Sequence, residues 1–111
     1  MNMLFVCSRN RWRSPTAEHV FSSHPGLVTS SAGIARDAEE VLTEEHLRWA
    51  HVVVGMERKH TQEARRIGQR AGVSPRYVVL GIPDKYPYMD PLLVALLQRK
   101  MATHLPCMEP S

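Results

Sequence analysis

Short apolar segments alternate with segments of helical spacing along this chain, and that alternation constrains its fold more than any other feature of the sequence. Apolar runs of this length are typical of strands buried inside a parallel sheet. Strands that alternate with helices predict an α/β fold in which right-handed crossovers place helices on both faces of the sheet. We predict four strands, at residues 3–6, 27–31, 51–56 and 77–82.

The expected helices begin at residues whose side chains favour helix starts. Ser14 and Asp90 each precede a proline, which places an N-cap residue directly before the first helical position. Two further helices are expected over 43–50 and 57–70.

The size and composition of the chain fit one ordinary globular domain. It has 111 residues, of which 43% are hydrophobic and 23% charged, so it is long enough for a single core. We expect this domain to span residues 1–104, and the proline-containing tail at 105–111 to be frayed. The formal net charge of +3 suits a phosphorylated or nucleic-acid partner, but a small excess of Lys and Arg is common and decides nothing alone.

The sequence favours a cytoplasmic protein without a metal or cofactor. The apolar N-terminal run lacks the flanks of a signal peptide, and no apolar stretch is long enough to span a membrane. Two widely spaced cysteines, Cys7 and Cys107, do not make a disulfide framework, which favours a reducing compartment. The six histidines show no metal-ligand spacing, and His60 is expected to face solvent on its helix.

The segment from Cys7 to Ser14 carries the chemistry that the sequence suggests. It places a cysteine directly after a strand, and an arginine and a serine where the next helix begins. A loop of this length can turn backbone N–H groups toward a phosphate, and the helix adds the positive end of its dipole. Arg13 can bind two phosphate oxygens, and the same positive field favours the thiolate of Cys7, the form that attacks phosphorus.

The other polar residues of this segment are candidate phosphate-binding residues. The spacing of Cys7 and Arg13 alone occurs often by chance, and a buried core cysteine is the alternative interpretation. Ser14 is also a candidate donor to the sulfur, and Trp12 either packs under the loop or forms a rim of the cleft. The candidates are Ser8, Arg9, Asn10, Arg11, Trp12 and Ser14.

The segment from Cys7 to Glu18 resembles the N-terminal signature of the low-molecular-weight protein tyrosine phosphatases, Cys-x5-Arg-Ser-Pro-x-Ala-Glu. Shorter similarities follow in order at residues 30–33 and 54–60. The resemblance implies a doubly wound sheet of four parallel strands with helices on both faces. It also implies metal-free hydrolysis of phosphotyrosine-like monoesters through a phosphocysteine intermediate on Cys7.

The chain departs from this family in three respects. It is shorter, with segments missing between Gly33 and His51 and near the C-terminus, and in this it is more similar to a shorter group of predicted phosphatases. Arg9 stands where the family has glycine, which introduces strain if the loop needs a positive φ there. Trp12 stands where some members have a second cysteine, so the thiol that could protect Cys7 by forming a disulfide is missing.

Cleavage of a phosphate ester also needs an acid that protonates the departing oxygen. The resembled family supplies it from an Asp-Pro-Tyr loop after the fourth strand. Here Asp84 keeps the spacing to Tyr86, whereas Asp90 keeps the proline and already has a role as an N-cap. We favour Asp84 as the acid, with Asp90 as the alternative. Tyr86 and Tyr88 either form a cleft wall that stacks on an aryl group or simply pack the loop.

The favoured function is hydrolysis of a phosphomonoester on a phosphotyrosine protein or a small aryl phosphate. Arsenate reduction on the same fold is less favoured, because it needs resolving thiols and only Cys107 is available. A module that binds phosphate or nucleic acid without catalysis is the other alternative, suggested by Arg9 and Arg11. Such a module has no need of Cys7 and Asp84 together.

Overall fold

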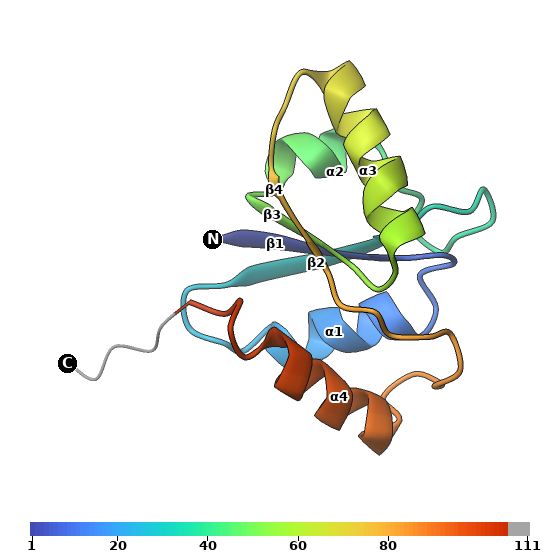
Figure 1. Cartoon of the computed structure of the whole chain (residues 1–111), viewed down its shortest axis with the longest axis vertical. Helices are drawn as coiled ribbons and strands as arrows, with labels where there is room; N and C mark the ends of the chain where they lie inside the picture. The colour runs from blue at the N-terminus through green and yellow to red at the C-terminus, as the bar shows by residue number, and fades with distance from the viewer. Residues whose placement is uncertain (107–111) are drawn as a thin grey trace.

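A sheet of four parallel strands organises the protein (Figure 1). The structure is a computed structural model that describes residues 1–106. The strands are β1 (Asn2–Cys7), β2 (Val28–Gly33), β3 (Val52–Gly55) and β4 (Arg76–Val79). They lie in the order β2–β1–β3–β4, and the predicted four-stranded parallel α/β fold is confirmed.

Helices cover both faces of this sheet, as the alternation of elements predicts. They are α1 (Arg13–Phe21), α2 (Glu44–Trp49), α3 (Arg58–Ala71) and α4 (Pro91–Met101). Figure 1 shows α1 and α4 below the sheet and α2 and α3 above it. No helix within residues 1–106 is long and apolar enough to cross a membrane.

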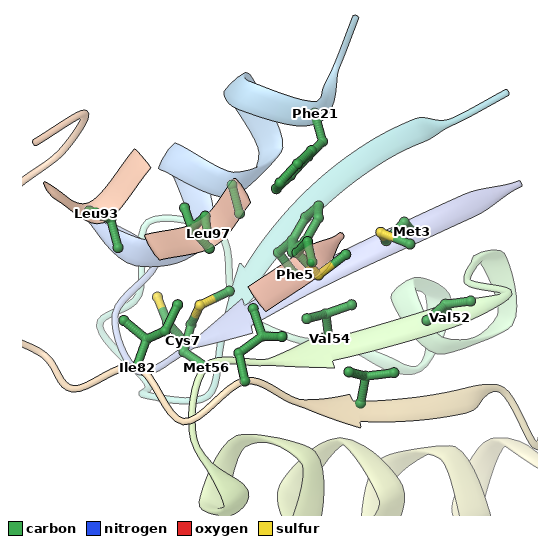
Figure 2. Close-up of a cluster of buried hydrophobic side chains, with 14 of the residues drawn as sticks. Met3, Phe5, Cys7, Phe21, Val52, Val54, Met56, Ile82, Leu93 and Leu97 are labelled. Carbon is green, nitrogen blue, oxygen red and sulfur yellow. The ribbon is translucent and has the colours of Figure 1, made fainter. Parts of the chain in front are cut away.

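The central strand β1 sends alternate side chains into two hydrophobic cores, because successive residues of a strand point to opposite faces. Phe5 and Cys7 lie in the core between the sheet and the helices α1 and α4, where the ring of Phe5 stacks on Phe21 with 5.8 Å between centroids (Figure 2). Leu4 and Val6 lie in the opposite core with side chains of α2 and α3. Cys7 is therefore the last residue of one core row, at the carboxyl edge of the sheet.

The chain beyond β4 stays attached to the sheet although the strand is shorter than predicted. Gly81 has a φ of +72°, which interrupts the extended backbone before the predicted end of the strand. The N–H of Ile82 nevertheless donates to the carbonyl of Met56 at 2.8 Å. This bond holds the chain at the carboxyl edge of the sheet directly before the loop that carries Asp84.

The start of α4 and the C-terminal segment can be compared with what the sequence predicts for them. Asp90 is the N-cap of α4, as predicted, and its carboxylate accepts a hydrogen bond from the N–H of Leu92 at 2.8 Å. In the tail that we expect to be frayed, Leu105 packs against the core and the carbonyl of Pro106 lies 3.1 Å from Nε2 of His24. Residues 107–111 of that tail lie outside the described residues.

Candidate active site

The segment from the last residue of β1 to the first residue of α1, residues 7–13, supplies most of the lining of a pocket of about 450 Å³ at the carboxyl edge of the sheet. We call it the Cys7 pocket. Most of the candidate residues meet here, although Asp84 comes from the far end of the sequence. Two parallel strands on one sheet explain this meeting, since their carboxyl ends lie at the same edge. The lining residues are Cys7, Ser8, Arg9, Arg11, Trp12, Arg13 and Asp84.

The sulfur of Cys7 has two hydrogen-bond partners, one in the loop that follows it and one in the first turn of α1. The backbone N–H of Asn10 donates to Sγ at 3.2 Å, and Oγ of Ser14 lies 2.9 Å from it. Ser14 Oγ also accepts from Nδ2 of Asn10 at 2.9 Å, and its O–H can donate to the sulfur at 2.9 Å or to the more distant carbonyl of Ala32 at 3.5 Å. Two neighbouring groups that can donate hydrogen bonds therefore converge on the sulfur.

Asn10 gives the loop its turn. Its φ is +57°, in the left-handed region that Asn tolerates better than most residues. Its side chain bridges Ser14 and Ser31, each at 2.9 Å from Nδ2. Among the described non-glycine residues, Asn10 and Met89 have positive φ, so the strain anticipated at Arg9 does not arise.

Ser14 is not the N-cap that the Ser-Pro pair predicts. The helix α1 begins two residues earlier than this pair predicts, at Arg13 instead of Pro15, with Trp12 at the N-cap position. Ser14 therefore lies inside the first turn, where its hydroxyl meets the sulfur of Cys7 instead of the N–H groups of the helix start. The local pattern located the helix start to within two residues, but the role of the hydroxyl depends on the path of the loop.

The segment between β2 and α2 holds the loop from outside. Three of its N–H groups donate to three successive carbonyls of the loop, so these carbonyls point away from the pocket. Backbone N–H groups in the same loop remain without an acceptor among residues 1–106, namely those of Arg9, Arg11 and Trp12. These N–H groups are available to bind an anion. The outer bonds are Ile34 to Cys7 (3.1 Å), Ala35 to Ser8 (2.9 Å) and Glu39 to Arg9 (3.0 Å).

Gly33 lets this outer segment approach the loop. A Cβ atom at this position would lie 2.6 Å from the carbonyl oxygen of Ser8 and 2.9 Å from the backbone nitrogen of Asn10. Both are backbone atoms, which cannot move aside as a flexible side chain can. The end of β2 therefore requires glycine for the loop to keep its shape.

Arg13 is almost completely buried, with 1% of its side chain exposed. Its Nη1 donates to Oε2 of Glu57 at 2.6 Å and to the carbonyl of Ile82 at 2.8 Å. Its Nε and Nη2 are buried without a partner among the described residues, and Nε lies 3.6 Å from Oδ1 of Asp84. Because buried donors without acceptors are strongly unfavourable, these two groups indicate a site for an oxyanion.

The expectation that His60 faces solvent is wrong. Its side chain is fully buried, and Nδ1 accepts a hydrogen bond from the N–H of Glu57 at 2.9 Å. Nε2 therefore carries the proton and donates to Oγ of Ser8 at 3.0 Å. Burial, together with the nearby charge of Arg13, lowers the pKa of His60 to about 4, so the ring is neutral at pH 7.

Five candidate residues lie outside the lining of the Cys7 pocket, and two of them, Asn10 and Ser14, make the hydrogen bonds to the sulfur of Cys7 described above. Tyr86 packs against the core beside α4, and Tyr88 is half-exposed near the start of α1. Asp90 is occupied as the cap of α4. The aromatic side chain that does line the pocket is Trp12, which is 43% exposed and forms its rim.

Within residues 1–106, no three His, Cys, Asp or Glu side chains gather as a metal site. Cys107, the resolving thiol considered for arsenate reduction, lies outside the described residues.

Comparison with known proteins adds the fold family. The sequence matches no protein-family model and no curated protein. The solved structure of Vibrio vulnificus Wzb in complex with benzylphosphonate is 22% identical to this chain and covers 93% of it and 95% of Wzb, with a TM-score of 0.72. The chain has the fold of the low-molecular-weight protein tyrosine phosphatases.

Two further structures share this phosphatase fold with the chain. The tyrosine phosphatase AmsI of Erwinia amylovora is 22% identical, and the match covers 96% of this chain and 93% of AmsI, with a TM-score of 0.71. The YwlE arginine phosphatase of Geobacillus stearothermophilus is also 22% identical, with 91% of this chain and 86% of YwlE covered and a TM-score of 0.67. The fold that the Cys7 to Glu18 signature implies is thereby confirmed.

Proposed function

We propose that this protein hydrolyses phosphomonoesters through a phosphocysteine formed on Cys7. The observation that carries the proposal is the position of Arg13 in the wall of the Cys7 pocket, where its Nε and Nη2 are buried without an acceptor among residues 1–106. A phosphoryl group beside the sulfur of Cys7 would accept from both. The planar guanidinium fork matches two phosphate oxygens, whose charge grows in the transition state.

In the first proposed step, the thiolate of Cys7 attacks phosphorus and the bond from phosphorus to the ester oxygen breaks. Asp84 donates a proton to the departing oxygen, which leaves as an alcohol or phenol. Its carboxyl lines the pocket and is about half-exposed, so both the departing oxygen and, in the next step, a water molecule can reach it.

In the second step, water attacks the phosphocysteine and the sulfur–phosphorus bond breaks. The carboxylate of Asp84 now takes a proton from that water, and inorganic phosphate leaves. The sulfur departs as a thiolate, which the N–H of Asn10 and the hydroxyl of Ser14 stabilise. The same two donors therefore assist both the attack and the release.

The favoured substrates are aryl phosphates, phosphotyrosine among them, because Trp12 offers an aromatic surface at the rim of the pocket. The neighbours in fold include tyrosine phosphatases and an arginine phosphatase. A cysteine-to-serine mutant of YwlE, 23% identical with a TM-score of 0.66, carries a phosphorylated active-site serine. That covalent adduct supports a phosphorylated enzyme intermediate on this fold.

Hydrolysis of p-nitrophenyl phosphate by the reduced protein, with a chelator present, tests the proposal. We expect turnover in the wild type and none in Cys7→Ser, with phosphate trapped on Cys7 in quenched reactions. Asp84→Asn and Asp90→Asn form a matched pair of carboxylate variants. Asp84→Asn should lower kcat about 100-fold or more, whereas Asp90→Asn should chiefly lower the stability of α4 by about 1 kcal/mol.

Two results would overturn the proposal. Turnover that survives in Cys7→Ser would exclude the cysteine as nucleophile. Turnover that disappears with the chelator and returns with added metal would indicate a different reaction. If Asp90→Asn loses more activity than Asp84→Asn at unchanged stability, Asp84 is not the acid.

A further inference from the structure

Two arginines besides Arg13 line the Cys7 pocket. Arg9 and Arg11 have side chains that are 61% and 49% exposed, so they stand at the rim while Arg13 lies buried inside. The unpaired donors of Arg13 already account for one phosphoryl group. The rim arginines thus supply positive charge beyond what a simple phosphate ester uses, and guanidinium groups keep that charge at any physiological pH.

Each rim arginine faces a carboxylate of the segment between β2 and α2. Nε of Arg9 lies 3.9 Å from Oδ2 of Asp37, and Nε of Arg11 lies 3.3 Å from Oε1 of Glu39. The two acids are two residues apart in the chain, as are the two arginines. Within the protein, a segment with acids at alternate positions therefore already pairs with the two arginines of this rim.

Both ion pairs are open to exchange. The carboxylates of Asp37 and Glu39 are 61% and 65% exposed, and exposed pairs of this kind contribute little to stability and are screened by salt. An incoming carboxylate can thus take the place of either acid.

We infer that the substrate is a phosphorylated acidic protein segment, an inference that rests on the phosphatase function proposed above. Carboxylates that flank the phosphorylated residue at alternate positions bind Arg9 and Arg11 in place of Asp37 and Glu39. Arg13 meanwhile holds the phosphoryl group. The buried arginine then serves the chemistry, and the two exposed arginines select the substrate by charge.

Two phosphotyrosine peptides of equal length test this inference, one with Glu at alternate positions on either side of the phosphotyrosine and the other with Gln there. At low salt the wild type should show a kcat/KM for the Glu peptide about fivefold higher than for the Gln peptide. The preference should vanish toward about 1 M ionic strength. In the Arg9→Gln, Arg11→Gln double variant the ratio of the two kcat/KM values should approach one, whatever the absolute rates.

Arg76→Gln is the matched control, because Arg76 is exposed at the start of β4, at the opposite edge of the sheet from the pocket. It should keep the wild-type ratio. Equal kcat/KM for the two peptides in the wild type, or a preference that persists in the double variant, overturns the inference. So does single-stranded RNA that inhibits turnover at lower concentration than the Glu peptide does, since it assigns the rim to nucleic acid.

The proposed function and this inference fail in different experiments. Cys7-dependent hydrolysis of p-nitrophenyl phosphate supports the phosphatase function whichever peptide is preferred. If the wild type turns over no substrate, the affinity of Cys7→Ser for the two phosphopeptides decides the inference alone. Tighter binding of the Glu peptide then supports it, and equal binding overturns it.

Discussion

Glu57 accepts a hydrogen bond from Nη1 of Arg13 at 2.6 Å, which joins the start of α3 to the Cys7 pocket. That hydrogen bond lowers the pKa of Glu57, so its carboxylate stays charged well below neutral pH. The carboxylate holds one edge of the guanidinium together with the carbonyl of Ile82. The other donors of Arg13 are left toward the pocket, and the orientation of this fork is what activity should depend on.

Arg13→Lys should therefore remove most of the activity although it keeps the positive charge. A lysine ammonium cannot bind Glu57 and two phosphate oxygens in one plane. We expect kcat/KM for p-nitrophenyl phosphate to fall about 100-fold or more. Arg11→Lys is the matched control at the exposed rim, and its loss should be much smaller. Equal losses in the two variants would contradict the assignment of Arg13 to the phosphoryl group.

Asn10 should tolerate glycine better than alanine. Both substitutions remove the amide that bridges Ser14 and Ser31, but only glycine adopts a φ of +57° without strain. We expect urea unfolding to show that Asn10→Ala is less stable than Asn10→Gly by about 1 kcal/mol. An alanine variant as stable as the glycine variant would show that the loop relaxes to another backbone conformation.

The buried His60 predicts a loss of stability in mild acid. Its pKa falls from 6.5 to about 4 on folding, so between these values the unfolded chain binds the proton more readily than the folded protein. The free energy of unfolding should thus be intact above about pH 6.5 and decrease by about 3 kcal/mol as the pH falls toward 4.

Urea unfolding at several pH values measures this dependence. His60→Gln should be less stable at pH 7 and should lose less stability between pH 6.5 and 4 than the wild type does. His19→Gln is the control, because His19 is exposed on α1 and its removal should leave the pH profile unchanged. A wild-type profile that is flat over this range would contradict a buried neutral ring.

Trp12 should contribute to the binding of aryl phosphates. Its ring is the aromatic surface in the lining of the Cys7 pocket, so Trp12→Ala should raise KM for p-nitrophenyl phosphate about threefold to tenfold. Trp12→Phe should restore most of that loss. Tyr88→Ala, on the flank of α1 outside the pocket lining, should leave KM unchanged. A larger increase of KM in Tyr88→Ala than in Trp12→Ala would show that the aryl group binds beside Tyr88 instead of Trp12.

The parts of this protein that the sequence predicts are those decided by neighbouring residues. Periodicity and apolar runs locate the strands, and Asp90 before Pro91 identifies the cap of α4. The spacing from Cys7 to Arg13 also brings cysteine and arginine to one pocket, because the loop between them is short and closed by a strand and a helix.

The parts that it does not predict depend on contacts between distant segments. His60 has the local surroundings of an exposed helix residue, yet its side chain is buried. Its partner Ser8 lies 52 residues away in the sequence, so the neighbours of His60 in the chain do not reveal the contact. Tyr86 and Tyr88 follow the sheet directly, but the path of the loop after Asp84 takes them past the pocket. No pattern of neighbouring residues in the sequence predicts the path of this loop.

The three outer hydrogen bonds from the segment after β2 to the carbonyls of the Cys7 loop have one more consequence. They are made entirely within the protein, so the loop has its anion-binding shape before any phosphate arrives. The binding energy of the phosphoryl group is then not consumed in ordering the backbone around it. Phosphate and its analogues should meet a preorganised cradle, and the free and the phosphorylated protein should share one loop conformation.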